Sequence, residues 1–263
     1  MGAMTEENLA SMREQVYKDP RPAEHFARFH ERSRARDPDW VYEAVRILTT
    51  LYAWTFFRAR GIGAENVPEG PVIIAPNHFS FMDHFFLGIS IRRKVRFMAK
   101  SQLFERPMQW VYTHGGVFPV RRGFADEEAF ATANSVLGRG GCVAMYSEGG
   151  RSRTGKLSDT VRRGIGRLTL ESGATVVPVA IHGSSRVRNW KRLQFPKVTV
   201  LYGDPIRWER IDDPSRDQQQ QVANEIFAQI RGLYAGLDSL GRKGVARRLR
   251  EAQRAGKRAR ATA

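Results

Sequence analysis

The sequence predicts an α/β protein in which a mostly parallel sheet is flanked by helices and preceded by an N-terminal membrane-docking helical segment. Short apolar runs alternate with longer stretches of helical periodicity, which is the pattern of βαβ units. Polar loops that contain glycine follow several of these runs. An aromatic stretch at residues 40–57 precedes the first apolar run, and it predicts the membrane-docking helix.

The composition limits the function classes. Of the 263 residues, 41% are hydrophobic and 10% aromatic, which is enough for a sizeable core and excludes disorder for most of the chain. The net charge of +16 requires an acidic partner, which is nucleic acid, anionic lipid headgroups or small phosphorylated substrates. The single cysteine, Cys142, excludes a disulfide scaffold, and six histidines without paired ligand spacing predict no metal site.

Residues 1–60 are predicted to be N-terminal helices. Residues 7–36 are polar and charged, whereas residues 40–57 are the most apolar stretch of the chain, with one narrow polar stripe at helical spacing. This stretch is slightly short for a membrane-spanning helix, and Glu43 and Arg46 lie inside it. We therefore predict an interfacial helix at 40–57, with a helix buried under the domain as the alternative.

Residues 61–240 are predicted to form the α/β domain. Six short apolar runs predict strands, and three periodic stretches predict helices. The strands are expected at residues 72–75, 95–99, 117–120, 142–146, 176–181 and 197–202, and the helices at residues 125–137, 162–172 and 218–237. Residues 241–263 are a basic tail with nine basic residues and one acidic residue, and they carry half of the net charge.

The first candidate site follows the strand at 72–75, where an α/β sheet usually places its functional loops. His78 can act as a base near neutral pH, and the carboxylate of Asp83 can fix its tautomer. Residues five apart on one helix point about 140° away from each other, so we expect His78 on the loop and Asp83 in the first turn of the next helix. Alternatively, Asp83 only caps that helix, because Ser80 and Asp83 match a capping box.

Two further loops combine glycine with arginine. Residues 115–121 (GGVFPVR) end on Arg121, and arginine is suited to bidentate binding of phosphate. Residues 146–152 (YSEGGRS) follow another strand, and their glycines free backbone N–H groups to face an anion. Residues 150–157 nearly match the phosphate-binding loop of NTPases, but Leu157 stands where a Ser or Thr is needed to hold magnesium.

Four blocks follow one another along the chain: Asn77-His78-x4-Asp83, Gly115-x-x-Phe118-Pro119-x-Arg121, Glu148-Gly149-Gly150-Arg151-Ser152 and Val177-Pro178-Val179. Their order and spacing resemble the PlsC-type glycerolipid acyltransferases, the 1-acylglycerol-3-phosphate acyltransferase family. The resemblance runs from about residue 72 to residue 202. Residues 97–100 (FMAK) are also similar to the family's strand that delivers a lysine.

The resemblance implies a role for each matching residue. It makes His78 the general base and Asp83 its partner, with no covalent acyl-enzyme. It also implies that Lys100 and Arg121 bind the phosphate of the acceptor. In the third block, the glycine N–H groups would stabilise the tetrahedral oxyanion, and the arginine would be a further phosphate contact. The residues of this block implied to shape the acceptor site are Glu148, Gly149, Gly150 and Arg151.

The activity that the resemblance implies is transfer of a fatty acyl group from an acyl thioester to the free hydroxyl of 1-acylglycerol 3-phosphate, giving phosphatidic acid. The cosubstrate is an acyl-CoA or acyl-carrier-protein thioester, and because a thioester is already activated we expect no metal or other cofactor. Two positions depart from the family pattern: Gly150 replaces a common Thr, and Tyr146-Ser147 a common aromatic–Pro pair. The alternative acceptors are therefore another lysophospholipid, glycerol 3-phosphate or a glycolipid.

The substrates and the charge predict where the protein acts. We expect a peripheral membrane protein on the cytoplasmic face of the cell membrane, held at an anionic membrane surface by the helix at 40–57 and the basic tail. Its other partners are the lysophospholipid acceptor and the acyl-CoA or acyl carrier protein. A non-enzymatic, basic nucleic-acid-binding protein is the alternative from another class. We expect no nucleic acid, because the aromatics concentrate in one apolar helix and do not interleave with basic residues.

Overall fold

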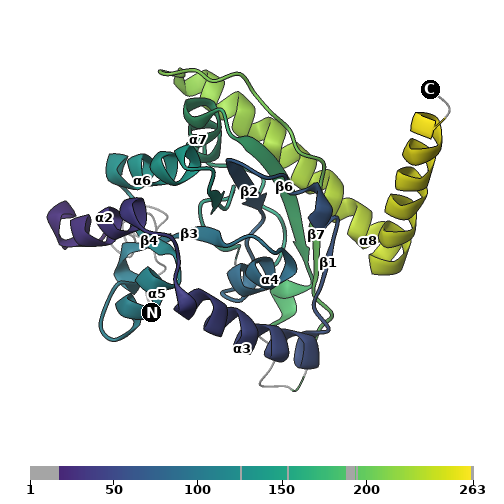
Figure 1. Cartoon of the computed structure of the whole chain (residues 1–263), viewed down its shortest axis with the longest axis horizontal. Coiled ribbons are helices and arrows are strands. Elements are labelled where there is room, and N and C mark those ends of the chain that lie inside the picture. Colours follow the sequence, from purple (N-terminus) through teal and green to yellow (C-terminus); the bar gives the residue numbers. More distant parts are fainter. Residues whose placement is uncertain (1–17, 125, 153, 188–192, 194, 262–263) are drawn as a thin grey trace, which may run out of the picture.

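The computed structural model describes residues 18–261, except residues 125, 153, 188–192 and 194. Within these residues the strands form one seven-stranded sheet in the order β1-β7-β6-β2-β5-β3-β4 (Figure 1). Every neighbouring pair is parallel except β6 and β7. The strands are β1 (Arg60–Ile62), β2 (Val72–Pro76), β3 (Val95–Lys100), β4 (Val117–Val120), β5 (Cys142–Ala144), β6 (Thr175–His182) and β7 (Thr199–Tyr202).

Helices cover both faces of this sheet. Figure 1 shows α6, α7 and the first part of α8 on one side of the strands and α3 and α4 on the other. The α-helices are α2 (Ala27–Ala35), α3 (Trp40–Phe57), α4 (Asp83–Ser90), α5 (Met108–His114), α6 (Glu127–Gly138), α7 (Gly164–Ser172) and α8 (Arg216–Ala261). Short 3-10 turns lie at Ala23–Phe26, Ala64–Asn66 and Ser101–Leu103. The predicted α/β fold with a mostly parallel sheet is confirmed.

The central strand β2 shows why its sequence is apolar at every position. Val72 and Ile74 belong to the core under α3 and α4, whereas Ile73 and Ala75 belong to the core under α6, α7 and α8. Successive side chains of a strand point to opposite faces, so a strand with helices on both faces must be apolar on both.

Two elements were not expected from the sequence. Strand β1 is three residues long, lies at the sheet edge and begins with the exposed Arg60, so it has no apolar run to reveal it. Helix α5 is seven residues long and has no buried residue, so its periodicity is weak. Both lie next to parts of the N-terminal segment, since β1 follows α3 directly and α5 contacts α2 and α3.

Helix α3 occupies the residues predicted for the interfacial helix, and its two faces differ. Ala53 and Phe57 are buried in the core beside α4. The opposite face is exposed, and its apolar side chains have between 60% and 68% of their surface free: Trp40, Ile47, Leu48, Leu51 and Trp54. The alternative of a helix wholly buried under the domain is therefore wrong. Among the residues described, no helix has the length and apolar character needed to cross a membrane.

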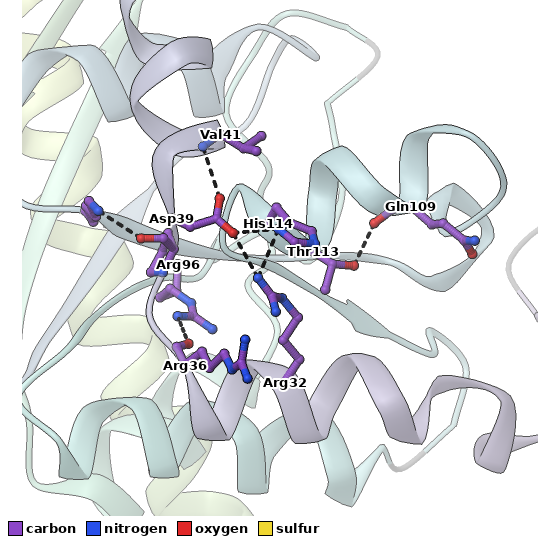
Figure 2. A network of polar contacts seen from close by, with 10 residues as sticks. Arg32, Arg36, Asp39, Val41, Arg96, Gln109, Thr113 and His114 are labelled. Atoms are coloured by element: carbon purple, nitrogen blue, oxygen red, sulfur yellow. Dashed lines mark hydrogen bonds and ion pairs between the residues drawn. The ribbon is translucent and has the colours of Figure 1, made fainter.

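A network of polar contacts fixes the start of α3 against α2 and α5 (Figure 2). Asp39 caps α3 by accepting a hydrogen bond from the N–H of Val41 at 3.0 Å. The other carboxylate oxygen lies 2.5 Å from Nδ1 of His114, at the end of α5, and 2.9 Å from a guanidinium nitrogen of Arg32 in α2. Arg96 of β3 donates to the carbonyl of Arg36 at 2.9 Å. These contacts hold α5 in place beside α3.

The basic tail is helical as far as Ala261 and bends away from the first part of α8 at Gly241, where φ is +62° (Figure 1). Its first turns pack against the sheet edge, because Val245 joins a core cluster with residues of β1, β6 and β7. Arg242 donates to Oγ1 of Thr199 at 2.8 Å and to the carbonyl of Arg58 at 2.7 Å. The start of the tail is thus part of the folded body.

Candidate active site

The sheet brings the predicted loops together at one edge. Strand β5 lies between β2 and β3, and β3 pairs with β4, all in parallel. The loops that follow β2 and β5 therefore start side by side, and Lys100 ends the adjacent strand β3. This is the carboxyl edge of a parallel sheet, where ligands of open α/β folds usually bind.

His78 and Asp83 form a hydrogen-bonded pair on the loop after β2 and at the start of α4. Nδ1 of His78 lies 2.9 Å from Oδ2 of Asp83, and the same oxygen accepts hydrogen bonds from the N–H groups of Phe79 at 2.7 Å and Ser80 at 2.8 Å. Asp83 therefore closes the loop ahead of α4 and also orients the imidazole. With the proton on Nδ1, the lone pair of Nε2 remains available as a base.

The surroundings of His78 favour its neutral form. Its ring stacks on Tyr146, with ring centroids 3.9 Å apart and an angle of 20° between the planes. The side chain retains only 11% of its exposed surface. Burial lowers the pKa of His78 below its ordinary value, and the hydrogen bond to Asp83 acts in the opposite direction. An imidazole with a lowered pKa is unprotonated at neutral pH, as a general base requires.

Glu148 joins the loop after β5 to the backbone of the His78 loop. One carboxylate oxygen accepts from the N–H of His78 at 2.9 Å, and the other accepts from the N–H of Ser158 at 3.2 Å. The carbonyl of His78 in turn accepts from the N–H of Ser152 at 2.8 Å. Burial raises the pKa of Glu148. In this arrangement Glu148 is a positioning residue for His78.

The two glycines after Glu148 differ in what they do. Gly149 has φ +66°, and a Cβ there would lie 2.6 Å from Cγ of Arg162, so only glycine fits without a shift. The N–H of Gly149 donates to the carbonyl of Tyr146 at 3.0 Å, which closes a turn. The N–H of Gly149 is thus used within the turn, and the oxyanion role expected for the two glycines stays a prediction, which we place on Gly150.

A cavity of about 310 Å³ opens beside His78. Lys100 and Arg151 line it, and no carboxylate in the described part of the chain forms an ion pair with either. Such uncompensated cations suit an anionic group of a substrate. His78, Lys100 and Arg151 are thus brought together as the sequence predicted.

Arg121, expected at the acceptor phosphate, lies elsewhere, and Arg122 lines the cavity instead. The guanidinium of Arg121 donates to the carbonyl of Arg21 at 3.1 Å and lies over the ring of Phe124. The two arginines follow the last residue of β4, and only the second of them lines the cavity. The N-terminal segment around Arg21, outside the region of resemblance, covers the side on which Arg121 lies.

A second, apolar cavity of about 300 Å³ continues from the first between α3, α4 and α5. The side chains that line both cavities are Phe81, His84, Phe97, Tyr112 and Val117. This apolar cavity was not predictable from the sequence, because its walls come from three helices of which one was not expected. No site role was predicted for Arg122, Tyr146 or His84, although each lies in or beside a predicted loop or residue of the site.

The His84 imidazole, where the cavities meet, makes a testable contribution to acid sensitivity. Burial lowers its pKa from the ordinary 6.5 to about 4. The unfolded chain then binds more protons than the folded chain between these values, so stability falls as the pH drops from 6.5 to 4. Between pH 7 and pH 4, the unfolding free energy of the wild type should therefore fall by about 3 kcal/mol more than that of His84→Phe.

Urea unfolding at the two pH values measures this difference. The matched control is His25→Phe, because His25 is an exposed histidine beside a ring. Equal acid sensitivity of wild type and His84→Phe would show that burial of this imidazole costs nothing.

Comparisons with known proteins relate part of this chain to acyltransferases. Residues 58–182 match the family model Acyltransferase. The chain is 30% identical over 166 residues to the glycerol-3-phosphate acyltransferase of Aeromonas hydrophila, an alignment that covers 54% of this chain and 20% of the relative. It thus spans about a fifth of that relative's length. The crystal structure of the 1-acyl-sn-glycerophosphate (LPA) acyltransferase PlsC from Thermotoga maritima is similar in fold, with a TM-score of 0.55 and 22% identity over 73% of this chain and 79% of that one.

By the match to the family model, residues 58–182 are similar to an acyltransferase domain. Within that class, the aligned part of the chain is similar in sequence to a glycerol-3-phosphate acyltransferase, and the fold is similar to that of PlsC.

Proposed function

We propose that this chain transfers a fatty acyl group from an acyl-CoA or acyl-carrier-protein thioester to the free hydroxyl of 1-acylglycerol 3-phosphate, giving phosphatidic acid. One observation carries the proposal. His78, which is paired with Asp83, lines one cavity with two uncompensated cations, Lys100 and Arg151, and that cavity continues into one lined almost wholly by apolar side chains. A phosphate on the acceptor suits the cations, and the fatty chain of the donor suits the apolar cavity.

In the proposed reaction, Nε2 of His78 accepts the proton of the acceptor hydroxyl as its oxygen attacks the thioester carbonyl. The carbon–oxygen bond forms, the carbon–sulfur bond breaks, and the proton on Nε2 passes to the departing thiolate. Asp83 holds the tautomer and stabilises the imidazolium formed on the way. The backbone N–H of Gly150 is the donor that we assign to the oxyanion.

Glycerol 3-phosphate is the second candidate acceptor. The relative from Aeromonas hydrophila is named for that substrate. Glycerol 3-phosphate has no acyl chain, so the donor's chain alone would need the apolar cavity between α3, α4 and α5. With 1-acylglycerol 3-phosphate as acceptor, the second chain would have to remain in the bilayer.

The experiment that tests the function is release of free thiol from palmitoyl-CoA and from palmitoyl-carrier protein, with each acceptor in turn. We expect release that depends on 1-acylglycerol 3-phosphate. Release with glycerol 3-phosphate alone would keep the mechanism and change the acceptor. No release with any phosphorylated or lysolipid acceptor would contradict the proposal.

Loss of one cation is expected to weaken acceptor binding. Arg151→Gln should raise the KM for the acceptor about 10- to 100-fold, because a hydrogen bond to a charged group contributes roughly 1.5–3 kcal/mol. The KM for the thioester should stay unchanged. The matched control is Lys156→Gln, which removes an exposed cation of the same loop outside the cavity. An equal change in both variants would indicate a diffuse charge effect instead of a phosphate contact.

We also propose that the protein is a peripheral protein of the cytoplasmic face of the cell membrane, with the outward face of α3 in the lipid interface. Trp110 and Met108 of α5 and Phe81 add exposed apolar side chains near this face, and Trp110 lies 6.2 Å from Trp40 between ring centroids. Aromatic side chains at such a surface are typical of interfacial helices.

Charges on this face should release the protein from vesicles. We expect Leu48→Asp combined with Leu51→Asp to lower partitioning onto vesicles about 100-fold, since burying one leucine side chain contributes about 1.5–3 kcal/mol. The matched control, Ala228→Asp with Ala235→Asp, adds the same two charges on the exposed side of α8 across the sheet. Vesicle sedimentation measures the partitioning of both double variants. Unchanged sedimentation of the α3 variant would remove α3 from the membrane contact.

A further inference from the structure

A third cavity, of about 390 Å³, lies at the carboxyl end of α3. Its walls come from the last turn of α3, the edge strand β1, the end of α4 and the first residue after the bend in α8. It shares no lining residue with the cavity beside His78. The reaction proposed above makes no use of it.

Three arginines line this cavity, and the described residues around it include no carboxylate. Arg58 donates to the carbonyl of Phe195 at 2.7 Å, and Arg242 donates to the backbone of Arg58 and Val198. Arg60 is exposed, and its side chain has no hydrogen-bond or ion-pair partner in the described part of the chain. Neutral carbonyls therefore hold two of the three guanidinium groups, and no carboxylate among the lining residues compensates the three positive charges.

The arginines disfavour one another's charge. Burial, and then the positive charges of Arg60 and Arg58, lower the pKa of Arg242. Like charges in one cavity cost free energy unless a counter-ion joins them. A phosphate group would supply that counter-charge, and guanidinium groups are the side chains best shaped to bind it.

The position of the cavity indicates which phosphate it meets. Trp54 lines it and has 61% of its surface exposed. The same outward face of α3 carries Leu51, which is 60% exposed. When that face lies in the lipid interface, Trp54 is at the depth typical of interfacial tryptophans, and the arginines beside it are at the level of the headgroups.

We propose that Arg58, Arg60 and Arg242 form a binding site for the phosphate headgroup of an anionic phospholipid, separate from the catalytic cavity. The inference rests on the membrane contact of α3 proposed above. A headgroup bound here would fix the carboxyl end of α3 at the bilayer surface, and with it the entrance between α3, α4 and α5.

Arg60→Gln is the variant that tests the site, because Arg60 holds no part of the fold together by its side chain. The probe is dihexanoyl phosphatidylglycerol below its micelle concentration, titrated by calorimetry, so that a diffuse surface charge cannot mimic a site. We expect Arg60→Gln to weaken its binding about fivefold or more, the usual contribution of one basic residue near an anionic leaflet. Two matched variants, Lys243→Gln beside the cavity and Arg151→Gln in the catalytic cavity, should bind as wild type does.

The other outcomes overturn the inference. Loss of binding in Arg151→Gln but not in Arg60→Gln would show that the probe occupies the catalytic cavity. Equal loss in Lys243→Gln would show a diffuse charge effect, and inorganic phosphate binding as tightly as the lipid would show a site for free phosphate. Acyl transfer in detergent should be the same in Arg60→Gln and wild type. An inactive wild type would contradict the proposed acyl transfer, whereas the lipid titration still decides the headgroup site.

Discussion

His78→Ala should lower kcat by about 10²- to 10⁴-fold, which is the usual contribution of a positioned general base. The loss should appear as acceptor-dependent thiol release, with the KM of the thioester little changed. The physical reason is that Nε2 of His78 is the nitrogen that its pairing with Asp83 leaves available beside the cavity. His78 also stacks on Tyr146, so the thermal midpoint of the variant should be recorded with its activity.

The fold offers a control of the same chemical kind. His182 and Asp238 form a second pair, with Nε2 and Oδ1 2.8 Å apart, and neither residue lines the cavity beside His78. His182→Ala should leave kcat within about twofold, because its imidazole does not line the cavity in which Nε2 of His78 is available. If the two variants lose activity equally, general-base catalysis by His78 is wrong.

The same histidine fixes the expected pH dependence. Burial lowers the pKa of His78 below its ordinary value, so protonation should switch activity off only on the acid side of pH 6.5. The acid limb of kcat/KM, which reports the free enzyme, should therefore have its midpoint below 6.5. A midpoint above 6.5 would mean that the pairing with Asp83 outweighs burial.

The sheet was predictable because its strands are buried on both faces. Residues such as those of β2 must be apolar at every position, and such runs stand out in a sequence. Strand β1 and helix α5 gave no such signal. Each depends on tertiary contacts, β1 on pairing with β7 and α5 on the contact of His114 with Asp39. Tertiary contacts of this kind override weak local propensity.

The site was predictable where chemistry and position coincide on one loop. His78 and Asp83 are five residues apart, so they can form a hydrogen bond when His78 is on the loop and Asp83 is in the first turn of the helix that follows. The arginine at the end of β4 was not predictable in the same way. Which of two adjacent arginines faces a cavity depends on what covers the other side, and here the segment around Arg21 does so. The contact of Glu148 with the backbone of His78 was likewise not predictable, because it joins residues 70 positions apart in the sequence.

Gly88→Leu should shorten the acyl chains that the protein accepts. Gly88 is a buried residue of α4 that lines the apolar cavity, and a Cβ there would meet only the hydroxyl of Tyr42, at 3.5 Å. A leucine therefore extends into the cavity instead of into the core, and replacing glycine within a helix also adds about 1 kcal/mol of helix propensity. The fold should tolerate the change.

The size of the effect follows from the methylenes that the leucine displaces. Burial of one methylene contributes about 0.8 kcal/mol. If the leucine keeps about three methylenes of the acyl chain out of the cavity, kcat/KM for palmitoyl-CoA should fall about 50-fold. Octanoyl-CoA should react nearly as before, because a short chain does not reach the new side chain. The control, Gly232→Leu, adds the same side chain on α8, where nothing lies within 4 Å. A uniform loss for both thioesters would mean that the acyl chain lies elsewhere and that the cavity between α3, α4 and α5 serves only the packing of the helices.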